Sequence, residues 1–190
     1  HALQSLIAAA LAFPVLLFMM AGEVHTPSLI VWVVAVLVLL AGRYHMIGIY
    51  QLRYDNVDGP MRQTFVRKYL WTWGAMGIGW GLAVALAYQQ ASLQTQFVCA
   101  IVLMGHAMVS LTAFSAYLPI FRIYTTALFS TALMGLLVQG FLATDDPLVW
   151  RHTVAMVVLL LVFWVLIRVA GKRLHAVHRA SLELQFSNQE

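Results

Sequence analysis

Long apolar stretches alternate with short polar connections along the whole chain. Six such stretches occupy residues 3–20, 29–47, 69–88, 96–116, 120–142 and 148–169. Each is close to the ~20 residues that a helix needs to cross a bilayer core. Lipid offers the backbone no hydrogen-bond partner, so stretches of this kind must be helical. The pattern predicts an all-α, integral membrane six-helix bundle over residues 1–170.

The longest connection, residues 48–68, is polar and has Gly59 and Pro60 at its centre. Because Gly-Pro interrupts helices, we expect two short interfacial helices here. Residues 55–59 (Asp-Asn-Val-Asp-Gly) superficially resemble a calcium-binding loop, but the later bidentate Glu is missing. They favour a turn instead.

The basic residues collect on one side of this pattern. Ten of the 11 Lys and Arg lie at or beside the second and fourth connections, or at the end of the last stretch and after it, and only Arg151 lies on the other side. Cytoplasmic connections retain Lys and Arg during membrane insertion. The chain is therefore expected to cross the membrane six times, with N and C termini cytoplasmic.

Composition supports a membrane domain, because 62% of the residues are hydrophobic and only 9% are charged. Soluble domains carry roughly 25% charged residues. The net charge of +4 matches anionic headgroups at the predicted inner face, so we expect a lipid bilayer and no nucleic acid as partner. The single cysteine, Cys99, excludes an internal disulfide and is expected in the core.

Ionisable groups inside a membrane are expensive and are therefore candidates for function. His106 lies near the middle of the fourth stretch, with Ser110 on the same stretch and Gln139 on the fifth. One interpretation is a neutral imidazole that is hydrogen-bonded to a neighbouring helix. The other is a residue that contacts a ligand or senses protons in a cavity of the bundle.

A second polar group lies at the predicted outer face, in or beside the outer connections: Glu23, His25, Asp145, Asp146, Arg151 and His152. These residues either bind the head of an external signal, set a response to acid, or are the ordinary polar residues of loops. The candidate ligand-binding residues are therefore His106, Ser110, Gln139, Asp145, Arg151 and His152.

Features of an enzyme or a redox protein are missing from the sequence. The histidines of the stretches lie at three different depths, which argues against bis-histidine haem, and no zinc motif or nucleophile with its base occurs. We expect no cofactor, no metal and no catalytic site in this segment.

The last apolar stretch continues into a polar segment, residues 171–190, with helical spacing. Its apolar or small positions follow one another at intervals of four, three, four and three residues: Ala170, Leu174, Val177, Ser181 and Leu184. This spacing predicts the start of a coiled coil that leaves the bundle and transmits a signal. A lone amphipathic helix that lies on the membrane gives a similar pattern.

The third stretch carries Gly74, Gly77 and Gly81, a small-residue face that contains GxxxG spacing. Such a face lets two helices approach closely. Packing within the bundle and contact in a homodimer are both compatible with it.

The residues after 176 resemble a junction of bacterial signalling proteins, in which a multi-helix membrane sensor continues into a helix of the form SLRLRFENE. Ser187 departs from the usual Glu, and the positions that match are Ser181, Leu182, Leu184, Phe186, Asn188 and Glu190. Two looser similarities are the aromatic, glycine-rich residues 71–82 and the Tyr-Leu-Pro sequence at residues 117–119.

This resemblance implies the membrane-embedded input domain of a bacterial hybrid sensor histidine kinase, in the inner membrane. It implies a homodimer, a C-terminal kinase module and a response regulator as partners. The minimal outer connections suit an amphiphilic signal, such as a fatty-acid-like quorum signal. The alternatives are the input domain of a diguanylate cyclase, a small membrane transporter, and a structural anchor.

Overall fold

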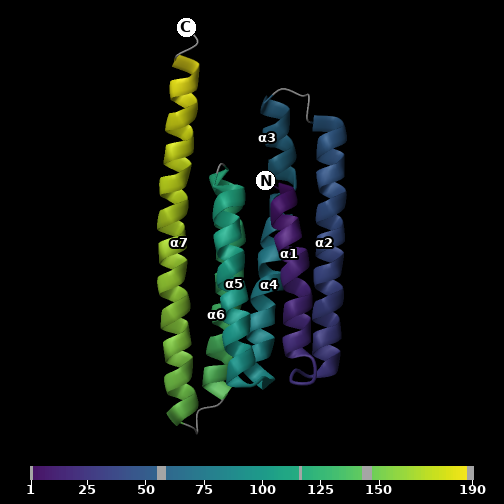
Figure 1. Ribbon diagram of the computed structural model, residues 1–190, viewed down its shortest axis with the longest axis vertical. Helices are drawn as coiled ribbons and strands as arrows, with labels where there is room; N and C mark the ends of the chain where they lie inside the picture. Colours follow the sequence, from purple (N-terminus) through teal and green to yellow (C-terminus); the bar gives the residue numbers. More distant parts are fainter. Residues whose placement is uncertain (1, 55–58, 116, 143–146, 188–190) are drawn as a thin grey trace.

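A computed structural model describes the chain except for residues 1, 55–58, 116, 143–146 and 188–190. The described residues form seven helices that run roughly parallel or antiparallel to one another (Figure 1). Their bounds are α1 Ala2–Met20, α2 Thr26–Tyr54, α3 Gly59–Lys68, α4 Leu70–Gln90, α5 Leu93–Phe114, α6 Leu118–Leu142 and α7 Pro147–Ser187. The predicted all-α fold is confirmed.

Five of these helices are long and apolar enough to cross a membrane: α2, α4, α5, α6 and α7. In α1 the apolar segment Leu6–Met20 is shorter than a full span. It nevertheless lies antiparallel beside α2 within the bundle (Figure 1). The prediction of six spans is therefore confirmed for five helices, and a sixth span in α1 stays a prediction.

The region between the second and fourth helices differs from the sequence-based expectation. We expected two short helices on either side of Gly59–Pro60, but α2 continues as one helix through Tyr54. Only α3, which begins at Gly59, is a separate short helix. Pro60 in the first turn of α3 is compatible with helix, because the first backbone N–H groups of a helix have no intrahelical partner. The expected turn at Asp55–Asp58 lies outside the described residues.

The two ends of the bundle differ in the connections that lie there. The α1–α2 and α4–α5 connections lie at one end, which we call the outer end after the predicted orientation. The α5–α6 connection, α3 and the exposed tail of α7 lie at the opposite, inner end (Figure 1). The orientation relative to a cell stays a prediction.

The core is built around the contact between α4 and α6. A Cβ at Gly77 would lie 2.5 Å from the backbone oxygen of Tyr124, and one at Gly81 would lie 2.6 Å from that of Leu128. Glycine at these two positions thus lets the two helix backbones touch. The small-residue face of α4 packs inside the bundle, which agrees with the first of its two interpretations.

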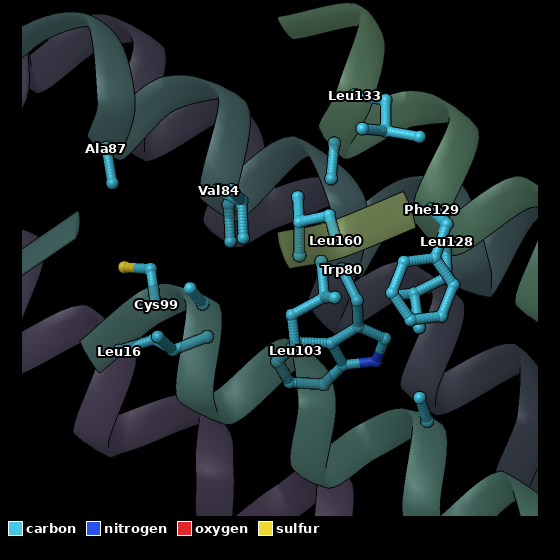
Figure 2. Close-up of a cluster of buried hydrophobic side chains, with 14 of the residues drawn as sticks. Leu16, Trp80, Val84, Ala87, Cys99, Leu103, Leu128, Phe129, Leu133 and Leu160 are labelled. Carbon is cyan, nitrogen blue, oxygen red and sulfur yellow. The ribbon is translucent and has the colours of Figure 1, made fainter. Parts of the chain in front are cut away.

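Trp80 of α4 is only 2% exposed and lies in the core beside Leu103 of α5 and Leu128 of α6 (Figure 2). Cys99, in the same cluster of buried side chains, is a buried free cysteine, as expected. Many large apolar side chains instead face outward, and on α7 these include Val158, Val162, Val165 and Leu166. An apolar exterior of this kind suits contact with lipid.

Candidate ligand-binding site

A small cavity lies between five helices in the inner half of the bundle. Its volume is about 30 Å³, which is room for one or two water molecules. We call it the inner cavity, and it is lined by Leu6, Ala9, Arg43, Trp73, Met76, Trp80, His106, Val109, Ser110, Phe114 and Tyr124. Of the candidate residues from the sequence, the structure brings His106 and Ser110 together here.

Arg43 of α2 brings a positive charge to this cavity. The side chain is 6% exposed, and its guanidinium carbon lies 3.1 Å from the centre of the Trp73 ring. Among the described residues no carboxylate forms an ion pair with it, and no Asp or Glu occurs within the five spans. A cation in a low-dielectric interior requires compensation, which the Trp73 ring supplies only in part.

His106 of α5 faces the same cavity. Its ring stacks on Trp80 with the two centroids 3.9 Å apart. The Nε2 atom is buried and has no hydrogen-bond partner among the described residues. Ser110, on the same helix, donates to the backbone oxygen of Ala107 at 2.6 Å. The expected hydrogen bond to a neighbouring helix is therefore not formed at Nε2.

Aromatic rings form another part of the wall of the inner cavity. The Phe114 ring lies 4.4 Å from that of Trp73 and 5.6 Å from that of Tyr124, edge to face in both pairs. Tyr124 is 5% exposed, so its phenol is enclosed with Arg43. A guanidinium and a phenol carry hydrogen-bond donors, and an imidazole carries at least one. This donor-rich, positively charged lining suits an anionic oxygen group.

His152 lies in a different polar cluster, at the outer end. Its Nε2 is 3.2 Å from Oε1 of Gln96, and its ring is parallel to that of Tyr88. Thr153 donates to the backbone oxygen of Val149 at 2.9 Å, so the Tyr88 hydroxyl donates to Thr153 at 2.7 Å. We call these side chains (His152, Gln96, Tyr88 and Thr153) the outer network, and each has a polar partner.

A second set of bonds ties the two outer connections to each other. The Glu23 carboxylate accepts the backbone N–H of Ser92 at 2.8 Å and the Ser92 hydroxyl at 3.0 Å. These bonds hold the pKa of Glu23 below its ordinary value, and the bond from the Ser92 backbone N–H has the largest effect. The backbone N–H of His25 donates to Gln90 beside them. Glu23 thus links the α1–α2 connection to the start of α5.

The other candidate ligand residues are dispersed. Gln139 is half-buried on α6, Arg151 is exposed on α7, and Asp145 lies outside the described residues. Their roles in ligand binding stay predictions. The sequence analysis missed Arg43, Trp73 and Tyr124, and it grouped Arg43 with the basic residues at or beside the inner connections. The available signal was the position of Arg43 inside the apolar residues 29–47.

The predicted transmission residues lie where α7 leaves the bundle. Ala170 and Leu174 are half-buried, whereas Val177, Ser181 and Leu184 are exposed. His175 donates through Nδ1 to the backbone oxygen of Ser115 at 2.8 Å, since a carbonyl can only accept. The contact of α7 with the bundle therefore extends to His175. The three predicted transmission residues beyond it are exposed.

No protein-family model, no curated protein and no solved structure matches the chain. Among the described residues, no group of three His, Cys, Asp or Glu side chains is arranged to hold a metal ion. Its five long apolar helices make the chain a multi-pass helical membrane protein.

Proposed function

We propose that this chain is the signal-input domain of a sensor histidine kinase, and that it binds an anionic amphiphile in the inner cavity. Residues 1–170 form the sensor, and residues 171–190 begin the signalling helix to a cytoplasmic kinase module. The kinase and its response regulator come from the resemblance of the tail. The bacterial inner membrane and a homodimer come with the same proposal.

The observation that carries this proposal is the buried charge of Arg43 without a carboxylate among the described residues. A ligand carboxylate would supply the missing negative charge and accept hydrogen bonds from the guanidinium fork. His106 and Tyr124 add a further nitrogen and a hydroxyl at the same cavity. An apolar chain on the ligand would suit the hydrophobic helices around the head.

The route for the signal is α7, a single helix of 41 residues. At about 1.5 Å per residue it is roughly 60 Å long, which exceeds the thickness of a bilayer core. Figure 1 shows its C-terminal part extending beyond the other helices. A rigid helix of this length carries a shift or rotation from the bundle to whatever follows it.

The small volume of the cavity suggests how binding would produce the signal. A carboxylate with its first methylene has four heavy atoms and needs more room than one or two waters. Helices around the cavity would therefore move apart in the bound state. A ligand shifts an equilibrium only when it binds one of two states better, and such a widened state meets this requirement. Since α6 carries Tyr124 and packs on α7, its movement would reach the exit helix.

The test uses the full-length protein in nanodiscs with ATP and its response regulator. Decanoate is the probe, and decanol is the uncharged control of equal chain length. We expect decanoate to change phosphoryl transfer and decanol to leave it unchanged. Arg43→Gln should abolish the response, and His152→Gln at the outer network should retain it.

Several outcomes would overturn parts of the proposal. Equal responses to decanoate and decanol would exclude recognition of the carboxylate by Arg43. If neither compound changes phosphoryl transfer, the chain would be assigned as a structural anchor of the kinase module. Absence of phosphorylation, with synthesis of a cyclic dinucleotide, would assign the chain to a diguanylate cyclase. Flux of decanoate across liposomes that contain the chain would identify a transporter.

A further inference from the structure

A basic groove lies at the inner end, between α6 and α7. Its volume is about 260 Å³, and its lining residues are Leu118, Phe121, Arg122, Arg168 and Lys172. Three of these five residues are cations. Arg122 and Lys172 are exposed, and among the described residues none of the three cations forms an ion pair. The groove therefore presents concentrated positive charge where α7 leaves the bundle.

Arg168 is held in place by its neighbours. Its Nη2 donates to the hydroxyl of Thr126 at 3.2 Å, and its guanidinium carbon lies 5.5 Å from the centre of the Trp164 ring. The Thr126 bond ties α7 to α6, while the other N–H groups of the guanidinium fork remain available for an acceptor. A fixed guanidinium beside two exposed cations is suited to a phosphate group.

A second groove continues from the first along the membrane-spanning part of α6. Its volume is about 420 Å³, and Arg122 lines both grooves. Its other lining residues are Ile78 of α4 and Ile123, Thr126, Ala127, Ser130 and Thr131 of α6. Of its hydroxyls, Ser130 donates to Ala127 of its own helix and Thr126 accepts from Arg168, while Ile78, Ile123 and Ala127 are apolar. This second groove can therefore accept an apolar chain.

We propose that the basic groove binds the phosphate of an anionic phospholipid of the inner leaflet, with one acyl chain in the groove along α6. The shared Arg122 favours a lipid over free phosphate, because it joins a charged site at the membrane surface to a groove at membrane depth. Basic pockets between helices on the cytoplasmic side suit such headgroups. The inference does not rest on the proposed sensor function. A lipid bound here would lie against α7 at its exit from the bundle.

The experiment measures how much phosphatidylglycerol the purified chain retains in detergent, by native mass spectrometry, with phosphatidylcholine as the zwitterionic comparison. The test variant is Arg122→Gln/Lys172→Gln, which removes the two exposed cations of the groove. The matched control is Arg67→Gln/Lys68→Gln, which removes one exposed Arg and one exposed Lys at the end of α3. The control side chains do not line either groove.

We expect the apparent affinity for phosphatidylglycerol to fall roughly 25-fold in the test variant, about fivefold for each cation, since a basic residue near anionic lipid contributes about 1 kcal/mol. The control should change it by less than about twofold. Equal losses in both variants, or no loss in the test variant, would overturn the proposal. Displacement of the lipid by millimolar inorganic phosphate alone would instead assign the groove to soluble phosphate. If the double variant fails to fold, Lys172→Gln alone should give the fivefold loss.

Discussion

The inner cavity and the outer network both contain polar side chains between helices, but they differ in how far these groups are hydrogen-bonded or paired. In the outer network, His152 meets Gln96, and Tyr88 meets Thr153, which itself bonds to Val149. In the inner cavity, Nε2 of His106 has no partner and Arg43 has no carboxylate among the described residues.

This difference indicates different roles. Interhelical hydrogen bonds in membrane proteins contribute about 0.6 kcal/mol each on average, so a satisfied network such as the outer one serves mainly to join helices. Buried polar atoms that lack partners destabilise a fold, and their presence needs another explanation. For the inner cavity, we take that explanation to be a ligand. The predictions below test this assignment.

The largest effect is expected at Arg43. Arg43→Gln should weaken binding of 2-bromodecanoate to the chain in nanodiscs roughly 10- to 100-fold, because a charge-assisted hydrogen bond contributes about 1.5–3 kcal/mol. Binding can be followed by quenching of tryptophan fluorescence, since the bromine next to the carboxylate would lie near Trp73 and Trp80 of the cavity. Arg43→Lys keeps the charge but loses the planar fork, and should give an intermediate loss.

His152→Gln is the control for this prediction, because it alters the outer network and leaves the inner cavity intact. It should change the affinity by less than about twofold. The reverse result, with a large loss at His152 and none at Arg43, would move the ligand head to the outer end, where the sequence pattern first suggested it.

The second prediction concerns the packing that forms the cavity wall. Gly77→Ala would place a methyl group 2.5 Å from the backbone oxygen of Tyr124, a residue of the wall. Overpacking of this kind costs about 1–3 kcal/mol, so the variant should unfold at a lower temperature and bind the ligand less well. Melting in detergent, followed by circular dichroism, measures the first effect.

Gly105→Ala provides the matched control, because nothing lies within 4 Å of a Cβ at this position of α5. Replacing an open helical glycine by alanine should be neutral or stabilise by up to about 1 kcal/mol. If both alanine variants melt alike, close approach of α4 to α6 is not what supports the cavity.

The sequence predicted the membrane class and the five membrane-spanning helices, because apolar length is read directly from the residues. It identified His106 and Ser110 as candidates but missed Arg43, which it assigned to the basic inner ends. Whether an arginine near a helix end faces lipid headgroups or a cavity depends on how helices pack. Two short helices broken at Gly59–Pro60 were expected, but α2 extends to Tyr54 and α3 begins at Gly59 and includes Pro60.

The third prediction compares the two histidines directly. His106→Leu removes a ring that stacks on Trp80, but also a buried nitrogen without a partner among the described residues, so the stability of the fold should stay unchanged or rise. His152→Leu removes the partner of Gln96 and a stacked ring, and should lower the unfolding free energy by about 1 kcal/mol. Unfolding titrations in mixed micelles would measure both. Equal losses of stability in the two variants would mean that His106 also serves to join helices.

The smallest effect is expected at Glu23, whose carboxylate is exposed to solvent and accepts bonds from Ser92. Its pKa is lower in the folded than in the unfolded chain, since the bonds from Ser92 favour the charged form. A group of this kind stabilises the fold above its unfolded pKa, and that contribution is lost as the pH falls through the folded pKa. Acidification from pH 6 to below 4 should therefore lower the melting temperature of the wild type.

Glu23→Gln should lose this part of the pH dependence while it keeps nearly the same melting temperature in acid. Glu183→Gln is the control, because Glu183 pairs only with Arg179 among the described residues and lies on the exposed tail beyond the bundle. If the wild type and Glu23→Gln respond alike to acid, the link between the two outer connections does not contribute to stability. The outer network would then be the main polar link at the outer end, beside the bond from His25 to Gln90, and the contrast with the inner cavity would depend on it.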